Sequence, residues 1–98
     1  MKQHLVEFVH IRVHDGQEDE FLASRPGAVA AVAAAIPGFV AAPVIARGED
    51  GLWTDVWIYD SVEQSEAANA KAADMPEIGR MAAVSEVVSI VMAWMPVA

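Results

Sequence analysis

Alternating apolar and polar positions predict that the chain begins with a β-strand over residues 4–14. One face of this strand is aliphatic except for Glu7. The other face mixes apolar and titratable side chains, namely Val6, Phe8, His10, Arg12 and His14. Such a strand fits a sheet that is covered on one side and carries a mixed surface on the other.

A helix is predicted next, because apolar residues then recur at helical spacing as far as Ile36. The acidic run 17–20 suits its first turn, where negative charge meets the positive end of the helix macrodipole. Pro26 has no backbone N–H to donate, so we expect the helix to kink or restart there, with Ser24 capping the second piece. The Pro-Gly pair at 37–38 ends the helix.

Residues 39–46 and 52–59 predict two more strands, joined by a hairpin loop with an Asp-Gly turn. Pro43 cannot donate to a strand ladder, so the first of the two is expected at a sheet edge or at a bulge. In the second, four large or polar side chains share one face: Trp53, Asp55, Trp57 and Tyr59.

The last third of the chain predicts a helix over 62–73, a short helix over 77–84 and a strand over 86–95. Ser61 and Gln64 form a capping box for the first helix, and Pro76 suits the first turn of the second. Strict alternation in the final strand places four residues on one side: Val88, Ile90, Met92 and Trp94.

The element order is therefore β-α-β-β-α-β, the ferredoxin-like α+β arrangement. Short connections and right-handed crossovers give a four-stranded antiparallel sheet with the helices on one face. The other face then lies open, which for a chain of 98 residues is a large apolar surface. Pairing two such faces in a homodimer would cover that surface.

Composition agrees with this expectation of a single domain over residues 1–98 that pairs with itself. Hydrophobic residues make up 55% of the chain and charged residues 20%, which is a large apolar share for a domain with little interior. The 19 small alanines are one explanation of that share. The other, which we favour, is that a second copy of the chain covers part of the apolar surface.

Charge and cysteine content exclude several classes of function. The net charge of −8 repels nucleic acid and anionic lipid, and the absence of cysteine excludes thiolate chemistry and disulfides. The first residues lack an apolar signal region, so a cytoplasmic protein is expected. Residues 26–46 carry no charge, but Pro37-Gly38 and Pro43 interrupt them, which disfavours a membrane span.

The whole chain resembles the antibiotic-biosynthesis-monooxygenase-like group of the dimeric α/β-barrel superfamily. The similar segments are the opening strand VEFVHIRVHDG, the acidic helix start EDEF, the IPGFV that leads into the second strand, and DVWIYDSVEQSEAA. The resemblance implies two sheets paired as a dimeric α/β barrel. It also implies oxidation of an aromatic or polycyclic phenol to a quinone with no metal, flavin or other cofactor.

The aromatic and acidic stripe is the first candidate site. Trp57 and Asp55 are candidate catalytic residues, and Trp53 and Tyr59 are candidate substrate contacts, since aromatic walls stack on a flat ring. Packing in the core or at a dimer interface explains the same stripe. The resemblance implies an asparagine near such a tryptophan, yet the only asparagine, Asn69, is expected in a helix, so that feature is missing.

The mixed face of the first strand is the second candidate site. His10 could remove a phenolic proton, and Arg12 could bind the resulting anion, with Phe8 as a further substrate contact. An ion pair of Arg12 with Asp55 or with a partner subunit is the alternative. No group of histidines and acids has the spacing of a metal site, and no histidine follows His14 as a haem ligand would require.

Two functions remain open on the sequence alone. One is a cofactor-independent monooxygenase-like enzyme acting on an aromatic small molecule. The other is a non-catalytic homodimer of the same fold that binds a small hydrophobic ligand or serves as an accessory protein; an isomerase or lyase on this scaffold is a third, weaker interpretation.

Overall fold

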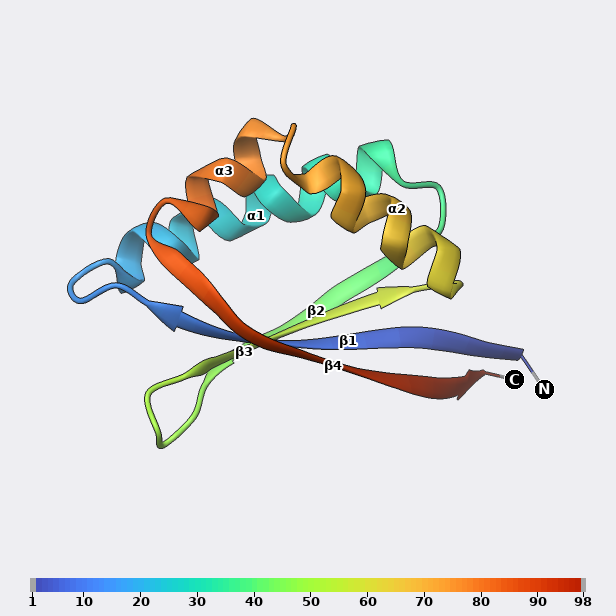
Figure 1. Ribbon diagram of the computed structural model, residues 1–98, viewed down its shortest axis with the longest axis horizontal. Helices are drawn as coiled ribbons and strands as arrows, with labels where there is room; N and C mark the ends of the chain where they lie inside the picture. Colours follow the sequence, from blue (N-terminus) through green and yellow to red (C-terminus); the bar gives the residue numbers. More distant parts are fainter. Residues whose placement is uncertain (1, 98) are drawn as a thin grey trace.

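In a computed structural model that describes residues 2–97, the chain forms four strands and three helices (Figure 1). In chain order these are β1 (Lys2–Val13), α1 (Glu18–Ala35), β2 (Phe39–Arg47), β3 (Trp53–Tyr59), α2 (Val62–Ala72), α3 (Pro76–Ala82) and β4 (Ser85–Val97). The predicted βαββαβ order is confirmed, including the short extra helix before the last strand.

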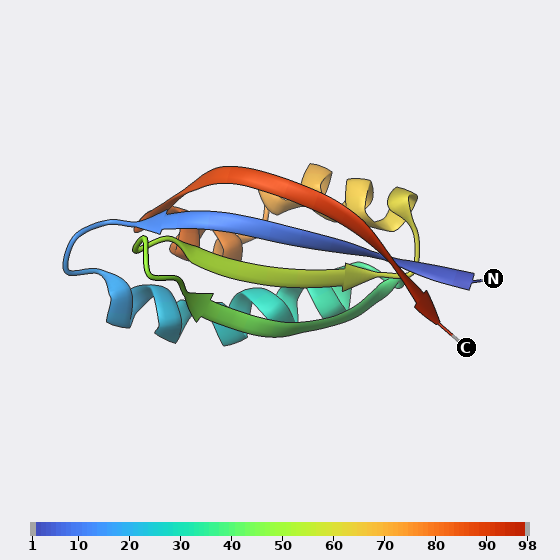
Figure 2. The same ribbon diagram turned by 90° about the horizontal axis from the view of Figure 1, so that it is seen from below.

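The four strands form one antiparallel sheet in the order β2-β3-β1-β4. All three helices lie on the same face of this sheet, as the sequence predicts (Figures 1 and 2). Figure 2 views the molecule from below, where the strands lie in front of the helices. The protomer therefore has two layers, with one sheet face covered and one bare.

Cross-strand register decides which side chains the helices cover. Glu7 pairs with Trp57 and Val9 with Asp55, so these side chains share the helix-covered face. Two buried clusters fill this face beneath α1, one around Phe21 and Trp53 and one around Ile36 and Trp57. A smaller cluster of Val6, Val56 and Ile58, with Phe8 packed against it, lies on the bare face.

The expected restart of the first helix at Pro26, with Ser24 as its cap, is wrong. α1 runs without interruption through Pro26, and the buried Ser24 caps nothing: its hydroxyl donates to the carbonyl of Phe21 at 2.8 Å. Proline removes the bond to the carbonyl of Leu22, which lies on the exposed side of α1 where water can replace that bond. The helix continues because its inner side stays packed on the sheet.

Pro43 lies where the sequence places it, in an edge strand with an irregular register. β2 pairs with β3 only, and the register shifts between Ala41 and Val44. The carbonyls on either side of the proline, those of Ala42 and Val44, both accept hydrogen bonds from the Arg25 guanidinium, at 3.0 and 3.3 Å. A side chain of α1 thus replaces the ladder bonds that the bulge loses.

The final strand departs from the predicted alternation. The register between β1 and β4 shifts at His10/Ile11, so Ile11 pairs with Val87 and Val9 with Ile90. Val87 therefore joins Ile90 on the helix-covered side, and the predicted grouping of Val88 with Ile90 is wrong. Much of β4 is uncovered in one protomer, and Val87 and Trp94 are 58% and 56% exposed.

The capping box at α2 is confirmed in its first half. The Ser61 hydroxyl accepts the backbone N–H of Gln64 at 3.3 Å. The side-chain amide oxygen of Gln64 accepts the backbone N–H of Gly38 at 3.0 Å, which ties α2 to the turn before β2.

Within residues 2–97, no helix is long and apolar enough to cross a membrane.

Gly38→Ala tests the contact between Gly38, in the turn before β2, and Gln64 of α2. A Cβ at position 38 would collide with the Gln64 side chain and with a carboxylate oxygen of Asp60, so we expect unfolding free energy to fall by about 1–3 kcal/mol. Gly79→Ala is the control, because a Cβ there meets nothing and alanine favours a helix by about 0.5–1 kcal/mol. Urea unfolding measures both; equal stability of the two variants would contradict the contact.

Candidate functional site

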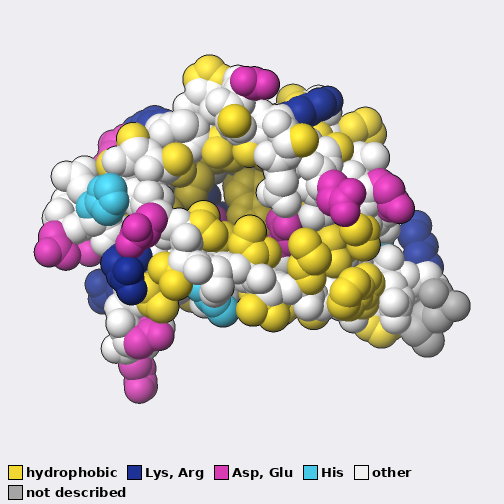
Figure 3. Space-filling model, viewed as in Figure 1, with side chains coloured by type: hydrophobic (Ala, Val, Ile, Leu, Met, Phe, Trp, Pro, Cys, Tyr) yellow, Lys and Arg dark blue, Asp and Glu magenta, His cyan; other side chains and the backbone are white. Residues whose placement is uncertain are grey.

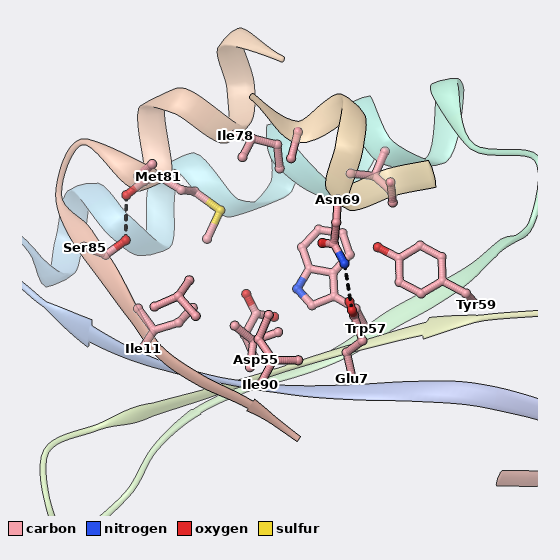
Figure 4. Close-up of a pocket in the computed structure, with 16 residues that line it drawn as sticks. Glu7, Ile11, Asp55, Trp57, Tyr59, Asn69, Ile78, Met81, Ser85 and Ile90 are labelled. Atoms are coloured by element: carbon pink, nitrogen blue, oxygen red, sulfur yellow. Dashed lines mark hydrogen bonds between the residues drawn. The ribbon is translucent and has the colours of Figure 1, made fainter. Parts of the chain in front are cut away.

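A cavity of about 210 Å³ lies between the sheet and the helices. Its floor carries side chains of β1, β3 and β4, and its roof carries side chains of α2 and α3 (Figure 4). The space-filling view shows the mouth as a hollow below the helices, with apolar side chains gathered beneath it along β4 (Figure 3). Glu7, Asp55, Trp57 and Tyr59 point into the cavity from the sheet, opposite Asn69 on α2.

Glu7 is the most unusual residue of the cavity, because its carboxylate is buried and pairs with no cation among residues 2–97. The residue is 2% exposed. Its Oε2 accepts the hydroxyl of Ser65 at 3.0 Å and the side-chain N–H of Asn69 at 3.1 Å, both from α2. Two neutral donors leave further lone pairs of this carboxylate free to accept a hydrogen bond from a ligand.

Asp55 is the second carboxylate of the floor, and it does have a cation. Its Oδ1 accepts the Nε and Nη2 groups of Arg25 at 3.0 and 2.8 Å, in a pair whose side chains are 2% and 13% exposed. Burial raises the pKa of Asp55 above its ordinary value, while the Arg25 and Trp57 side chains lower that pKa in part. The Arg25 guanidinium therefore offsets the cost of burying a charged Asp55.

The aromatic side chains of the floor are fixed against one another. Phe39 packs edge-on against Trp57 and Tyr59, with ring centroids 6.0 and 6.1 Å apart, and the Arg25 guanidinium lies 5.9 Å from the Trp57 ring. Burial and the nearby Glu7 and Asp55 charges raise the pKa of Tyr59 well above that of an ordinary phenol. Tyr59 consequently stays protonated, so its O–H can donate a hydrogen bond.

The structure divides the predicted site residues between the two faces of the sheet. Asp55, Trp57 and Tyr59 line the cavity, whereas Trp53 shares their face but packs in the core, with its ring 5.7 Å from that of Phe21. His10, Arg12 and Phe8 alternate to the bare face and do not line it.

The residues of the bare face have other partners. His10 Nδ1 lies 3.2 Å from the Ser89 hydroxyl, and Phe8 packs on Val6 and Val56. Arg12 pairs with Glu86 at 3.0 Å, so the expected ion pair with Asp55 is wrong. The cation beside Asp55 comes from α1 instead.

Sequence reasoning missed Glu7, Ser65, Asn69 and Arg25. The asparagine expected to be absent from the site is present: Asn69 lies at the cavity rim, although it belongs to a helix. One signal for Glu7 was available, since it is the single charged residue on an aliphatic strand face. Ser65 and Asn69 are four residues apart, which places both on one side of α2. Among the described residues, no group of three histidines or acids could hold a metal ion.

Comparison with known proteins gives a likeness of fold. No family model matches the chain, and no curated protein matches its sequence significantly. Among solved structures, a candidate antibiotic biosynthesis monooxygenase from Bordetella bronchiseptica superposes with a TM-score of 0.73 at 16% identity, covering 100% of this chain and 99% of that one. SnoaB, a cofactor-independent oxygenase from Streptomyces nogalater, gives 0.70 at 19% identity over 95% and 92%.

The chain has the fold of the antibiotic biosynthesis monooxygenases. A further candidate monooxygenase of this kind, from Caulobacter crescentus, superposes with a TM-score of 0.69 at 14% identity, covering 99% of this chain and 92% of that one. The resemblance noted in the sequence is thereby confirmed for the architecture. In this chain, the cavity that Asp55, Trp57 and Tyr59 line lies on the helix-covered face of the sheet.

Arg25→Gln tests the ion pair that supports the floor. Removing one partner of a buried pair leaves Asp55 uncompensated, so we expect the free energy of unfolding at pH 7 to fall by about 3 kcal/mol. Arg12→Gln breaks an exposed pair, with side chains 60% and 58% exposed, and is the control, with an expected loss below about 1 kcal/mol.

The loss in Arg25→Gln is also expected to depend on pH. Without the guanidinium, the folded-state pKa of Asp55 rises further above the 3.8 of an ordinary aspartate. A raised folded pKa contributes stability below the unfolded pKa, and that stability disappears as the pH rises through the folded value. The deficit relative to the unaltered protein is therefore largest at neutral pH and shrinks toward pH 3.8. A deficit that is constant with pH in urea unfolding would contradict this account.

Proposed function

We propose that the protein is a cofactor-independent oxygenase that oxidises a small, flat phenol to a quinone. The observation that carries the proposal is the buried Glu7 carboxylate, which lies in a largely apolar cavity between aromatic side chains and has no cation beside it. The fold shared with SnoaB supports the same reaction class, since that protein is a cofactor-independent oxygenase.

Glu7 acts as the general base in this proposal. It removes the proton of the phenolic O–H, and the phenolate that results is electron-rich enough to reduce dioxygen directly. One dioxygen adds to the ring carbon para to the oxygen. Loss of water then leaves the para-quinone, so that phenol and O₂ give quinone and H₂O.

Neutral donors stabilise the developing phenolate. The Asn69 amide donates one of its two N–H bonds to Glu7, which leaves the second available at the cavity rim. The Tyr59 O–H keeps its proton because the pKa of this phenol is raised, so it too can donate. Hydrogen-bond donors held in place in a dry cavity stabilise a developing charge more than water does.

The size of the cavity favours a small substrate. Its volume of about 210 Å³ lies below the range of about 300–1,000 Å³ for pockets that enclose drug-sized ligands. One or two fused rings fit within it. A ligand of three or four rings would extend through the mouth, over the apolar side chains of β4.

Oxygen uptake with hydroxylated naphthalenes and anthrones tests the proposal. We expect Glu7→Gln to lower kcat by about 10²–10⁴-fold, because the amide cannot take the proton. Glu66→Gln removes the same charge from an exposed position of α2 and should keep full activity, as should His10→Ala on the bare face. Binding of these phenols without oxygen uptake would instead identify a non-catalytic ligand-binding protein, and loss of activity in His10→Ala would move the base to the other face.

We also propose that two copies pair through the bare sheet face and the uncovered β4. The exposed Val91 lies on this face beside Phe8, next to the buried cluster around Val56. Covering exposed valine and methionine side chains of this kind is a strong reason to associate.

Sedimentation equilibrium at micromolar protein checks this pairing. We expect twice the 10.5 kDa mass of one chain for the unaltered protein and a single-chain mass for Val91→Lys. Leu22→Lys introduces the same charge at an exposed apolar position of α1 and should leave the dimer intact. A single-chain mass for the unaltered protein would rule out the pairing.

A further inference from the structure

We propose that the cavity selects its substrate by charge: it accepts a neutral O–H donor and rejects a molecule that carries a carboxylate or sulfonate. Glu7 is the specificity-determining residue. The inference rests on the proposed function for the kind of ligand, a flat phenol, and adds the charge state in which that ligand is bound. It follows from where the charges of the cavity lie.

The charged side chains that line the cavity are both acidic. Of the described residues that form its wall, Glu7 and Asp55 carry charge, and the others are apolar, aromatic or neutral polar. Within residues 2–97, the ion pairs join Arg12 to Glu86, Arg25 to Asp55 and Arg80 to Glu20. None of these cations reaches Glu7, whose hydrogen bonds come from Ser65 and Asn69.

Arg25, the buried cation of the covered face, is already bound to other groups. Arg25 directs Nε and Nη2 at Asp55, and Nη2 also donates to two backbone carbonyls of β2. The guanidinium lies over the Trp57 ring and is not part of the cavity wall. Rotating it toward an anionic ligand would leave the buried Asp55 and the bulge carbonyls without their partner, which is costly. An anion in the cavity would therefore have no counter-charge.

The cavity thus contains one uncompensated negative charge, that of Glu7. In the proposed reaction the negative charge passes from Glu7 to the phenolate, because the proton that leaves the phenol arrives on the Glu7 carboxylate. The net charge in the cavity stays the same. A neutral phenol satisfies this arrangement before and after proton transfer. A ligand that arrives already charged adds a second negative charge at close range in a poorly solvated space, where like charges repel strongly.

A pair of ligands of nearly the same shape tests the inference directly. Methyl 1-hydroxy-2-naphthoate is neutral, and 1-hydroxy-2-naphthoate is its carboxylate. In isothermal titration calorimetry at pH 7, we expect the ester to bind at least about tenfold more tightly than the carboxylate. Naphthalene-2-sulfonamide and naphthalene-2-sulfonate should differ in the same direction, and this comparison needs no variant.

The variant that identifies the residue is Glu7→Gln, with Glu66→Gln as the matched control. In Glu7→Gln the preference for the ester should fall below about threefold, mainly because the carboxylate binds better, whereas Glu66→Gln keeps the full preference. A merely structural role of Glu7 would weaken both ligands together and leave their ratio unchanged.

The outcomes separate this inference from the proposed reaction. Equal binding of the neutral and charged ligands to the unaltered protein, no binding of either, or an undiminished preference in Glu7→Gln would each overturn the charge selection. Tight, charge-selective binding without oxygen uptake would support the selection and refute the oxygenase. Oxygen uptake with the neutral and the charged member of a pair at equal kcat/KM would support the oxygenase and refute the charge selection.

Discussion

Two carboxylates lie on the covered face of the sheet, and the rest of the site depends on how each is accommodated. The charge of Asp55 is compensated by Arg25, which also donates to the carbonyls on either side of Pro43. Arg25 thereby joins α1 to β3 and to the edge strand β2. Glu7 is accommodated by Ser65 and Asn69 without a cation. Since an isolated buried charge is expensive, the same donors that allow Glu7 to be buried also fix its position at the cavity.

The sequence predicts the fold almost completely, because the two-residue period of the strands and the turn residues between elements agree with each other. Its errors lie where long-range contacts override local signals. Pro26 does not break α1, because the inner side of this helix packs through Phe21 and Ala28 on strand residues such as Trp53. A bulge in β4 reverses the side on which Val87 lies, and no turn residue announces it.

The site is predicted only in part, for a reason of geometry. Periodicity groups Asp55 with Trp57 and, separately, His10 with Arg12, but it does not say which group the helices cover. That depends on the right-handed crossovers and on register, which places Glu7 opposite Trp57. The contribution of α2 lies beyond strand periodicity altogether, because Ser65 and Asn69 reach Glu7 across 58 and 62 residues of sequence.

Stability and chemistry make opposite demands on this face. A cation beside Glu7 would make its burial easier, as Arg25 does for Asp55, but it would also occupy the carboxylate that the proposed reaction uses as its base. Ser65 and Asn69 fix the Glu7 side chain with neutral donors instead. Among residues 2–97 no cation pairs with Glu7, and this feature links the architecture of the sheet to the proposed reaction, which begins with proton transfer.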